Sequence, residues 1–173
     1  MKDGFFRTAD ELVFERLLAT DLETAWRFLT DPDKRALWLC GGVIEPRAGG
    51  KVMMVFHNDR LSPIKETVPE AMKCHGGACF EGEVTEWNPP HVLAHTWDGS
   101  LVRFELEEAG PRQVRLTLTH AGMASLDADS RTGTLAGWHT HFDILTAQLT
   151  GVTPPGFFAR HAENERHYAG SPA

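Results

Sequence analysis

Cysteine is scarce in this 173-residue sequence, which contains only three, and an odd, sparse set of this kind does not form a disulfide framework. No apolar run approaches the roughly 18 residues that a membrane-spanning helix needs. The first ten residues include acidic side chains and lack the apolar region of a signal peptide. We therefore expect a cytoplasmic protein that has no membrane partner.

An excess of positive charge is also missing, because the net charge is −7. Nucleic acids and anionic membranes both require clustered Lys and Arg, so we expect neither as a partner. The sequence has no G-x-S-x-G nucleophile elbow and no phosphate-binding glycine loop. Cys74 and Cys79 have a spacing that zinc could use, with His75 and His57 nearby, but the second half of such a site is absent. We expect no metal and no cofactor.

Two periodic patterns dominate the second half of the chain. Residues 114–120 alternate between apolar and polar side chains, as a half-buried strand does. Further on, apolar residues recur in steps of three and four, which predicts a helix of about four turns opening at Gly137 and Trp138. This stripe consists of Leu135, Trp138, Phe142, Leu145 and Leu149.

The remaining elements segregate along the chain. A strand at residues 11–18 precedes two short helices, the first capped by Thr20 or Asp21 and the second opened by Asp31 and Pro32. The second helix is expected to end at Gly41 and Gly42. Such an order predicts an α+β fold with an antiparallel sheet of about six to seven strands. The further strands are expected at residues 43–46, 51–57, 78–87, 91–97, 100–107 and 114–120.

We expect a single domain at residues 1–153, since a hydrophobic content of 42% over this length suits one core. Residues 154–173 contain Pro154, Pro155 and a Gly-Ser-Pro-Ala end, which predicts a partly disordered tail. Residues 58–77 contain two prolines and two glycines without a clean period. They are expected to form a long loop that is either mobile or functional.

Several stretches together resemble the SRPBCC superfamily, whose members have the helix-grip or START-like fold. Within it, the chain looks most like the family of activator of heat shock protein ninety ATPase homologues. No single motif is decisive, but their order and spacing over residues 12–150 are specific. The matching stretches are Ala25-Trp-Arg-Phe-Leu-Thr-Asp-Pro32 with Trp38, Gly49-Gly50-Lys51, residues 80–87, Pro89-Pro90, Thr96-Trp97, residues 114–120 and Gly137-Trp138.

The resemblance implies a curved antiparallel sheet wrapped around a long C-terminal helix, with a cavity between them. Members of the superfamily include ligand carriers, polyketide cyclases and aromatases, and resistance proteins, so no catalytic set carries over. The long loop at residues 58–77 and the tail at residues 154–173 depart from the family pattern. The chaperone activators carry a second domain that has no counterpart here, so the resemblance does not imply chaperone activation.

We interpret the chain as a domain that binds a small, mostly apolar molecule between its sheet and its last helix. Aromatic side chains would supply contact area, and His120 would supply a directional polar contact. Gly137 is expected to let the helix approach a strand closely. The predicted lining residues are Trp38, Phe56, Trp97, Phe104, His120, Trp138 and Phe142.

Two alternatives stay open at this point. His95 and His120 lie on apolar strand faces, so a cyclase or hydrolase could use either as a general base in the same pocket. His139 and His141 flank the helix stripe on opposite edges and cannot both reach one point. The second alternative is a protein-interaction module that docks a partner, or itself as a homodimer, through the loop and the outer sheet.

Overall fold

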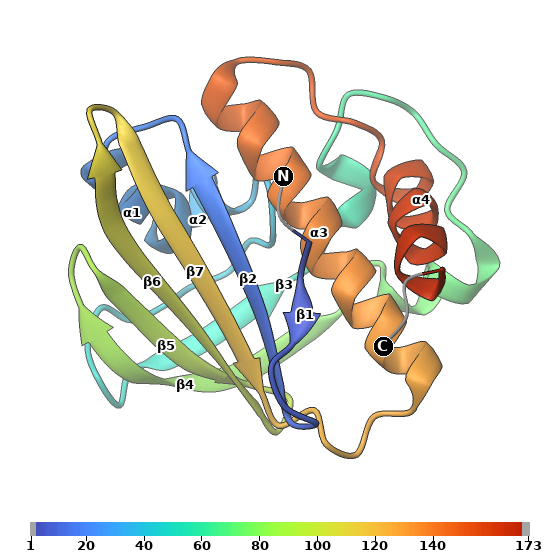
Figure 1. Cartoon of the computed structure of the whole chain (residues 1–173), viewed down its shortest axis with the longest axis horizontal. Helices are drawn as coiled ribbons and strands as arrows, with labels where there is room; N and C mark the ends of the chain where they lie inside the picture. Colours follow the sequence, from blue (N-terminus) through green and yellow to red (C-terminus); the bar gives the residue numbers. More distant parts are fainter. Residues whose placement is uncertain (1–2, 171–173) are drawn as a thin grey trace.

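A computed structural model describes residues 3–170, apart from the side chains of Cys74 and His75. Within this part of the chain, seven antiparallel strands form one sheet in the order β1-β2-β7-β6-β5-β4-β3. The sheet curls around one side of a long helix, α3 (Figure 1). The strands are β1 (Phe5–Phe6), β2 (Glu11–Leu18), β3 (Lys51–Val55), β4 (Cys79–Asn88), β5 (Val92–Trp97), β6 (Ser100–Gly110) and β7 (Gln113–Ala121).

The helices complete the α+β helix-grip fold that the sequence predicts. Asp21 caps α1 by accepting a hydrogen bond from the Thr24 amide at 2.8 Å, and Asp31 caps α2 through the Asp33 amide at 2.9 Å. No helix within residues 3–170 is both long and apolar enough to cross a membrane. The helices are α1 (Leu22–Thr30), α2 (Pro32–Arg35), α3 (Ala128–Thr150) and α4 (Phe157–Ala169), with 3-10 helices η1 (Asn58–Arg60) and η2 (Glu70–His75).

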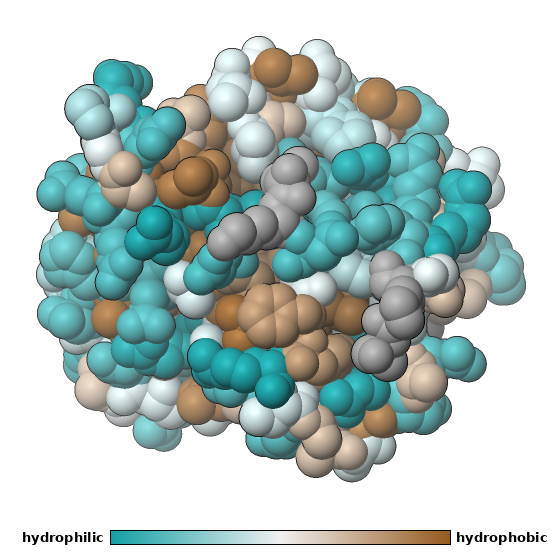
Figure 2. Space-filling view, in the orientation of Figure 1, coloured by the Kyte–Doolittle hydropathy of each residue, from teal (hydrophilic) through white to brown (hydrophobic). Residues whose placement is uncertain are grey.

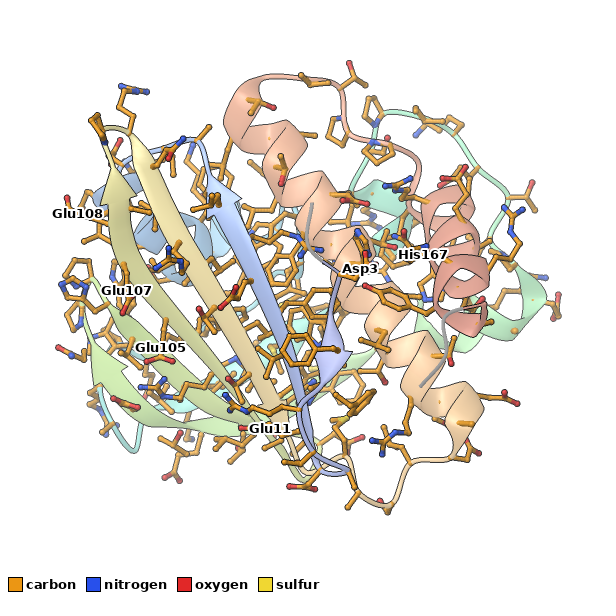
Figure 3. The ribbon with its side chains drawn as sticks, viewed as in Figure 1. Asp3, Glu11, Glu105, Glu107, Glu108 and His167 are labelled. Carbon is orange, nitrogen blue, oxygen red and sulfur yellow. The ribbon has the colours of Figure 1, made fainter. Side chains whose placement is uncertain are left out.

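The two faces of the sheet differ as the alternation predicts. On β7, Val114, Leu116, Leu118 and His120 are buried on the inner face, which packs against α1 and, at His120, against α3. The opposite face is charged: Glu105 and Glu107 lie on the side of β6 away from α3 (Figure 3). Only one face of the sheet therefore contributes to the core.

The molecular surface in the view of Figure 1 is largely hydrophilic. Figure 2 shows one apolar cluster near the centre of this face, in the region of β1. Phe5 in β1 is 52% exposed. This face therefore offers a small apolar area rather than a broad docking surface.

The closed end of the core is built around Trp38. Its indole N–H donates to the Phe28 carbonyl at 2.8 Å, and its ring stacks on Phe142 with centroids 5.9 Å apart. Phe104 meets the same indole edge-on at 6.5 Å. These residues join α1, β6 and the second half of α3 in one apolar cluster.

Some boundaries differ from the predicted ones. Helix α3 begins nine residues before Gly137, at Ala128, and Asp127 caps it by accepting from the Ser130 amide at 2.8 Å. Helix α2 ends at Arg35 rather than at Gly41 and Gly42, and residues 36–39 form a turn. Residues 43–46 contribute only an isolated bridge from Ile44 instead of a strand.

The prediction of a partly disordered tail at residues 154–173 is wrong for residues 157–169, which form α4. This helix packs on the side of α3 away from the sheet (Figure 1). Phe157 and Tyr168 are buried, and the Asn164 side-chain amide donates to Thr140 Oγ1 on α3 at 3.0 Å. His167 on α4 also forms a hydrogen bond with Asp3 near the start of the chain, with Nε2 and Oδ2 2.8 Å apart (Figure 3).

The long loop at residues 58–77 is tied to α4. The Glu66 carboxylate accepts hydrogen bonds from the Phe158 and Ala159 amides at 3.0 and 2.8 Å, and Ser62 Oγ donates to the Pro154 carbonyl at 2.8 Å. A Cβ on Gly156 would lie 2.4 Å from Glu66 Cδ, so a larger residue there would push this carboxylate aside. The two segments that depart from the family pattern therefore form one wall of the molecule.

Replacing Glu66 with alanine is expected to lower the free energy of unfolding by about 0.5–2 kcal/mol, the usual cost of losing a helix N-terminal cap. The loss should be concentrated in α4, whose first amides would lose their acceptor. Hydrogen exchange measured along α4 and urea denaturation check this result. Glu70→Ala, which removes an exposed carboxylate of the same loop, is the matched control, and an equal loss in both variants would contradict the assignment.

Candidate ligand-binding site

A pocket of about 1280 Å³ lies between the first half of α3, the ends of β5, β6 and β7, helix α4 and the segment around the long loop. Its volume exceeds the range of about 300–1,000 Å³ that is usual for small-molecule sites. Apolar contact area comes from six Phe and Trp side chains on its walls. They are Phe56, Phe80, Trp97, Trp138, Phe157 and Phe158.

The first half of α3 presents small residues to this pocket. Ser130, Gly133, Thr134 and Gly137 all line it, at the spacing of one helix face. A Cβ built on Gly137 would meet no atom within 4 Å. The expectation that Gly137 allows close approach to a strand is therefore wrong, because the glycine faces open pocket space.

The seven predicted lining residues divide into two groups. Phe56, Trp97, His120 and Trp138 line the pocket. Trp38, Phe104 and Phe142 are not among the lining residues, since the closed core buries all three with at most 2% exposure. Sequence periodicity marks both groups as inward-facing but carries no signal for where packing ends and the pocket begins.

The inner face of β4 is likewise divided between residues that line the pocket and residues that are buried in the core. Phe80 lines the pocket, whereas Val84 on the same face is fully buried in the core. A Cβ on Gly82 would lie 2.3 Å from the Thr96 carbonyl oxygen. Larger residues at positions 82 and 84 would therefore disrupt packing rather than fill the pocket.

His120 is held by hydrogen bonds at both ring nitrogens. The Trp138 indole N–H donates to Nδ1 at 3.0 Å, and Ser100 Oγ lies 2.8 Å from Nε2. The indole is only a donor, so Nδ1 must carry the lone pair and Nε2 the proton in the neutral ring. Burial lowers the pKa of His120 to about 4, which keeps the ring neutral near pH 7.

This protonation pattern does not suit nucleophilic catalysis. Ser100 and His120 resemble a nucleophile and base by distance, yet Nε2–H donates to Ser100 Oγ and has no lone pair to receive a proton. Ser100 Oγ in turn donates to the Trp97 carbonyl. The stacked rings of Trp97 and His120, with centroids 5.7 Å apart, instead form a fixed wall of the pocket.

His95, the other candidate base, does not line the pocket. Its ring is 2% exposed, packs 6.5 Å from Phe104, and bonds through Nδ1 to the Thr96 carbonyl at 3.0 Å. Burial lowers its pKa. The geometry therefore makes His95 a structural residue of the inner sheet face.

His141 lines the pocket, although it is not among the seven predicted lining residues. Its Nδ1–H donates to the Trp38 carbonyl at 2.8 Å, and burial lowers its pKa to about 4. His139, two residues earlier, points elsewhere and bonds to the Tyr168 hydroxyl at 2.8 Å. The prediction that these two histidines do not reach one point agrees with this arrangement.

Helix α4 supplies two further pocket residues, His161 and Glu165. His161 is 7% exposed, and its Nδ1 lies 3.8 Å from Glu165 Oε2. Burial lowers the pKa of His161, although the Glu165 charge and the Gly133 carbonyl act in the opposite direction. Neither residue was predicted as part of a site, because residues 154–173 were expected to form a partly disordered tail.

The structure describes the side chains of two of the three cysteines, Cys40 and Cys79. No group of three or more His, Cys, Asp or Glu side chains among the described residues could hold a metal ion. Cys79 is exposed, and Cys40 is buried, which raises the pKa of its thiol to about 11. The side chains of Cys74 and His75 lie outside the described residues.

Comparison with known proteins agrees with the architecture. The sequence matches the family described as Activator of Hsp90 ATPase homolog 1-like protein over residues 19–150. A solution structure of a Bordetella parapertussis protein is 35% identical, with a TM-score of 0.78 over 99% of this chain and 91% of that chain. No match was found among curated proteins.

More distant structures show the same fold alone. A conserved protein of unknown function from Enterococcus faecalis is 20% identical, with a TM-score of 0.68 over 96% of this chain and 86% of that chain. CalU16 from Micromonospora echinospora is 17% identical, with a TM-score of 0.63 over 96% of this chain and 92% of that chain.

Proposed function

The chain belongs to the Activator of Hsp90 ATPase homolog 1-like family, and from this premise we propose that it binds a small, mostly apolar molecule in the pocket beside α3. The fold of this family is in general a ligand-binding scaffold. The proposal is supported by a large pocket with aromatic walls.

The observation that carries the proposal is the open space at Gly137. A glycine inside a helix costs about 1 kcal/mol relative to alanine. Close packing does not explain the glycine, because a Cβ at this position would have no atom within 4 Å. We infer that the glycine keeps the pocket wide enough for a ligand.

The hydrogen bonds of His120 and the burial of His95 favour ligand binding without turnover over catalysis. The lone pair of His120 Nδ1 is engaged by Trp138, and its Nε2 carries the proton. His95 is buried away from the pocket. Neither of the histidines proposed as a general base has a free lone pair facing a ligand.

Gly137→Leu is expected to weaken binding of the neutral fluorescent probe N-phenyl-1-naphthylamine by at least about tenfold, because the leucine side chain would occupy the pocket. The same change should raise the free energy of unfolding by up to about 1 kcal/mol, because leucine favours helix more than glycine does. Fluorescence titration and urea denaturation measure the two effects.

Gly137→Ala is the matched control for this prediction. It should give a similar gain in helix stability but retain most of the probe affinity, since a methyl group takes up little of the pocket. Unchanged probe affinity in a folded Gly137→Leu protein would place the probe elsewhere and refute the proposed site.

A further inference from the structure

Three hydrogen-bond acceptors lie on the wall of the pocket that α3 and α4 share. His141 comes from α3, and His161 and Glu165 come from one face of α4. The ring of Phe157 contacts both histidines, with centroids 5.1 Å from His141 and 5.9 Å from His161. Both imidazoles therefore lie beside the same aromatic ring.

The protonation state of His141 follows from its bond to Trp38. A carbonyl oxygen can only accept, so Nδ1 carries the proton and Nε2 of the neutral ring carries the lone pair. No hydrogen bond joins Nε2 to any described residue, and His141 lines the pocket. His141 therefore offers the pocket an acceptor that cannot become a donor by ring reorientation without breaking the bond to Trp38.

His161 presents a second unpartnered nitrogen. Its Nδ1 is buried and makes no hydrogen bond. Glu165 Oε2, at 3.8 Å, is too distant for a hydrogen bond but places negative charge beside the ring. A buried polar atom without a partner is costly, by about 1–3 kcal/mol, so a bound molecule that supplied the missing hydrogen-bond partner would gain from it.

Resting on the function proposed above, we propose that the ligand is an apolar molecule that carries a hydrogen-bond donor, O–H or N–H, which binds Nε2 of His141 beside His161 and Glu165. The aromatic side chains of the pocket walls contact the apolar part of the same molecule. An anionic ligand of the same shape is disfavoured, because it would face the lone pair of His141 Nε2 and the Glu165 carboxylate.

The test compares four probes that share a naphthalene frame: 2-naphthol, 2-naphthylmethylammonium, 2-methoxynaphthalene and 2-naphthoate. Isothermal titration calorimetry with the full chain gives each dissociation constant. We expect 2-naphthol to bind about three- to tenfold more tightly than 2-methoxynaphthalene, although the ether is the more apolar of the two. We expect 2-naphthoate to bind most weakly. Comparison of 2-naphthylmethylammonium with 2-naphthol then distinguishes a cationic from a neutral donor.

The variant His141→Asn tests whether Nε2 of His141 causes the preference for 2-naphthol over 2-methoxynaphthalene. The asparagine amide can still donate to the Trp38 carbonyl, as Nδ1–H does, but nothing replaces Nε2. The ratio between 2-methoxynaphthalene and 2-naphthol dissociation constants should fall to about 1. His139→Asn makes the same change two residues earlier on α3, outside the pocket lining, and should leave the ratio unchanged.

A measurement on the unmodified protein covers the case in which His141→Asn does not fold. The imidazole ¹⁵N resonance of His141 Nε2 should shift on addition of 2-naphthol and stay in place with 2-methoxynaphthalene. Equal affinities for these two probes, a ratio that persists in His141→Asn, or no response of the ¹⁵N resonance would overturn this inference and leave the proposed function standing. Failure of every neutral probe to bind would overturn both.

Discussion

Replacing Trp138 with alanine is expected to lower the free energy of unfolding by about 3–5 kcal/mol, the range for truncating a large buried side chain. Trp138 is 4% exposed and packs against Phe104 and Phe142, with ring centroids 5.9 and 5.8 Å away. Its removal also leaves the lone pair of His120 Nδ1 without its donor. Urea denaturation followed by far-ultraviolet circular dichroism measures the loss.

Trp138→Phe separates the two causes of this loss. Phenylalanine keeps most of the aromatic packing but cannot donate to His120, so it should cost about 1–3 kcal/mol. Trp87→Ala, at a half-buried position on β4, should cost less than Trp138→Ala. A loss below about 1 kcal/mol in Trp138→Ala would mean that this part of α3 does not pack on the sheet as described.

Acidification from pH 7 to pH 4 is expected to remove about 3 kcal/mol of stability for each of His120 and His141. Burial lowers the pKa of both rings to about 4, against 6.5 in an unfolded chain. Between these values the unfolded state binds protons that the folded state does not. Their contribution is therefore complete above pH 6.5 and is lost progressively as the pH falls toward 4.

Denaturation midpoints measured across this pH range test the effect. Burial lowers the pKa of His95 and His161 as well, so their contributions have the same sign. In His141→Asn the dependence on pH should be weaker than in the unmodified protein. A stability that is flat between pH 6.5 and 4.5, or a His120 ring that titrates near 6.5 by NMR, would show that these rings are solvated.

The sequence predicted much of the sheet, because strict alternation is a direct consequence of one buried face. Residues 114–120 show this pattern, and the structure places His120 inward, as the pattern indicates. The first two helices were also predictable, since Asp21 and Asp31 cap them with their own side chains. These signals are local, and tertiary packing only reinforces them.

The first half of α3 was not predicted, and the reason is the pocket itself. A helix is recognised by an apolar stripe, but Ser130, Gly133 and Thr134 face the pocket rather than the core. The apolar stripe therefore begins only at Leu135, the first of its residues to pack against the core. Asp127, the side-chain cap of α3, was the one local signal that could have revealed the true start.

Helix α4 was missed for a related reason. Its buried face includes His161 and Asn164, which a hydropathy pattern counts as surface residues. Asn164 is satisfied only by Thr140 on α3, and the helix N-terminus is capped by Glu66 from a loop 92 residues earlier. Contacts between residues so far apart leave no periodic trace in the sequence, so the polar wall of the pocket was invisible before the structure was known.

Backbone chemical-shift mapping with 2-naphthol tests most directly whether this pocket is the ligand-binding site. We predict saturable shifts at Gly133, Gly137 and His141 on α3 and at Phe157 on α4. A smaller pocket of about 450 Å³ between the second half of α3 and α4, lined by Thr146, Ala147 and Val152, should show none. Shifts confined to that second region, or no saturable shifts at all, would contradict the account.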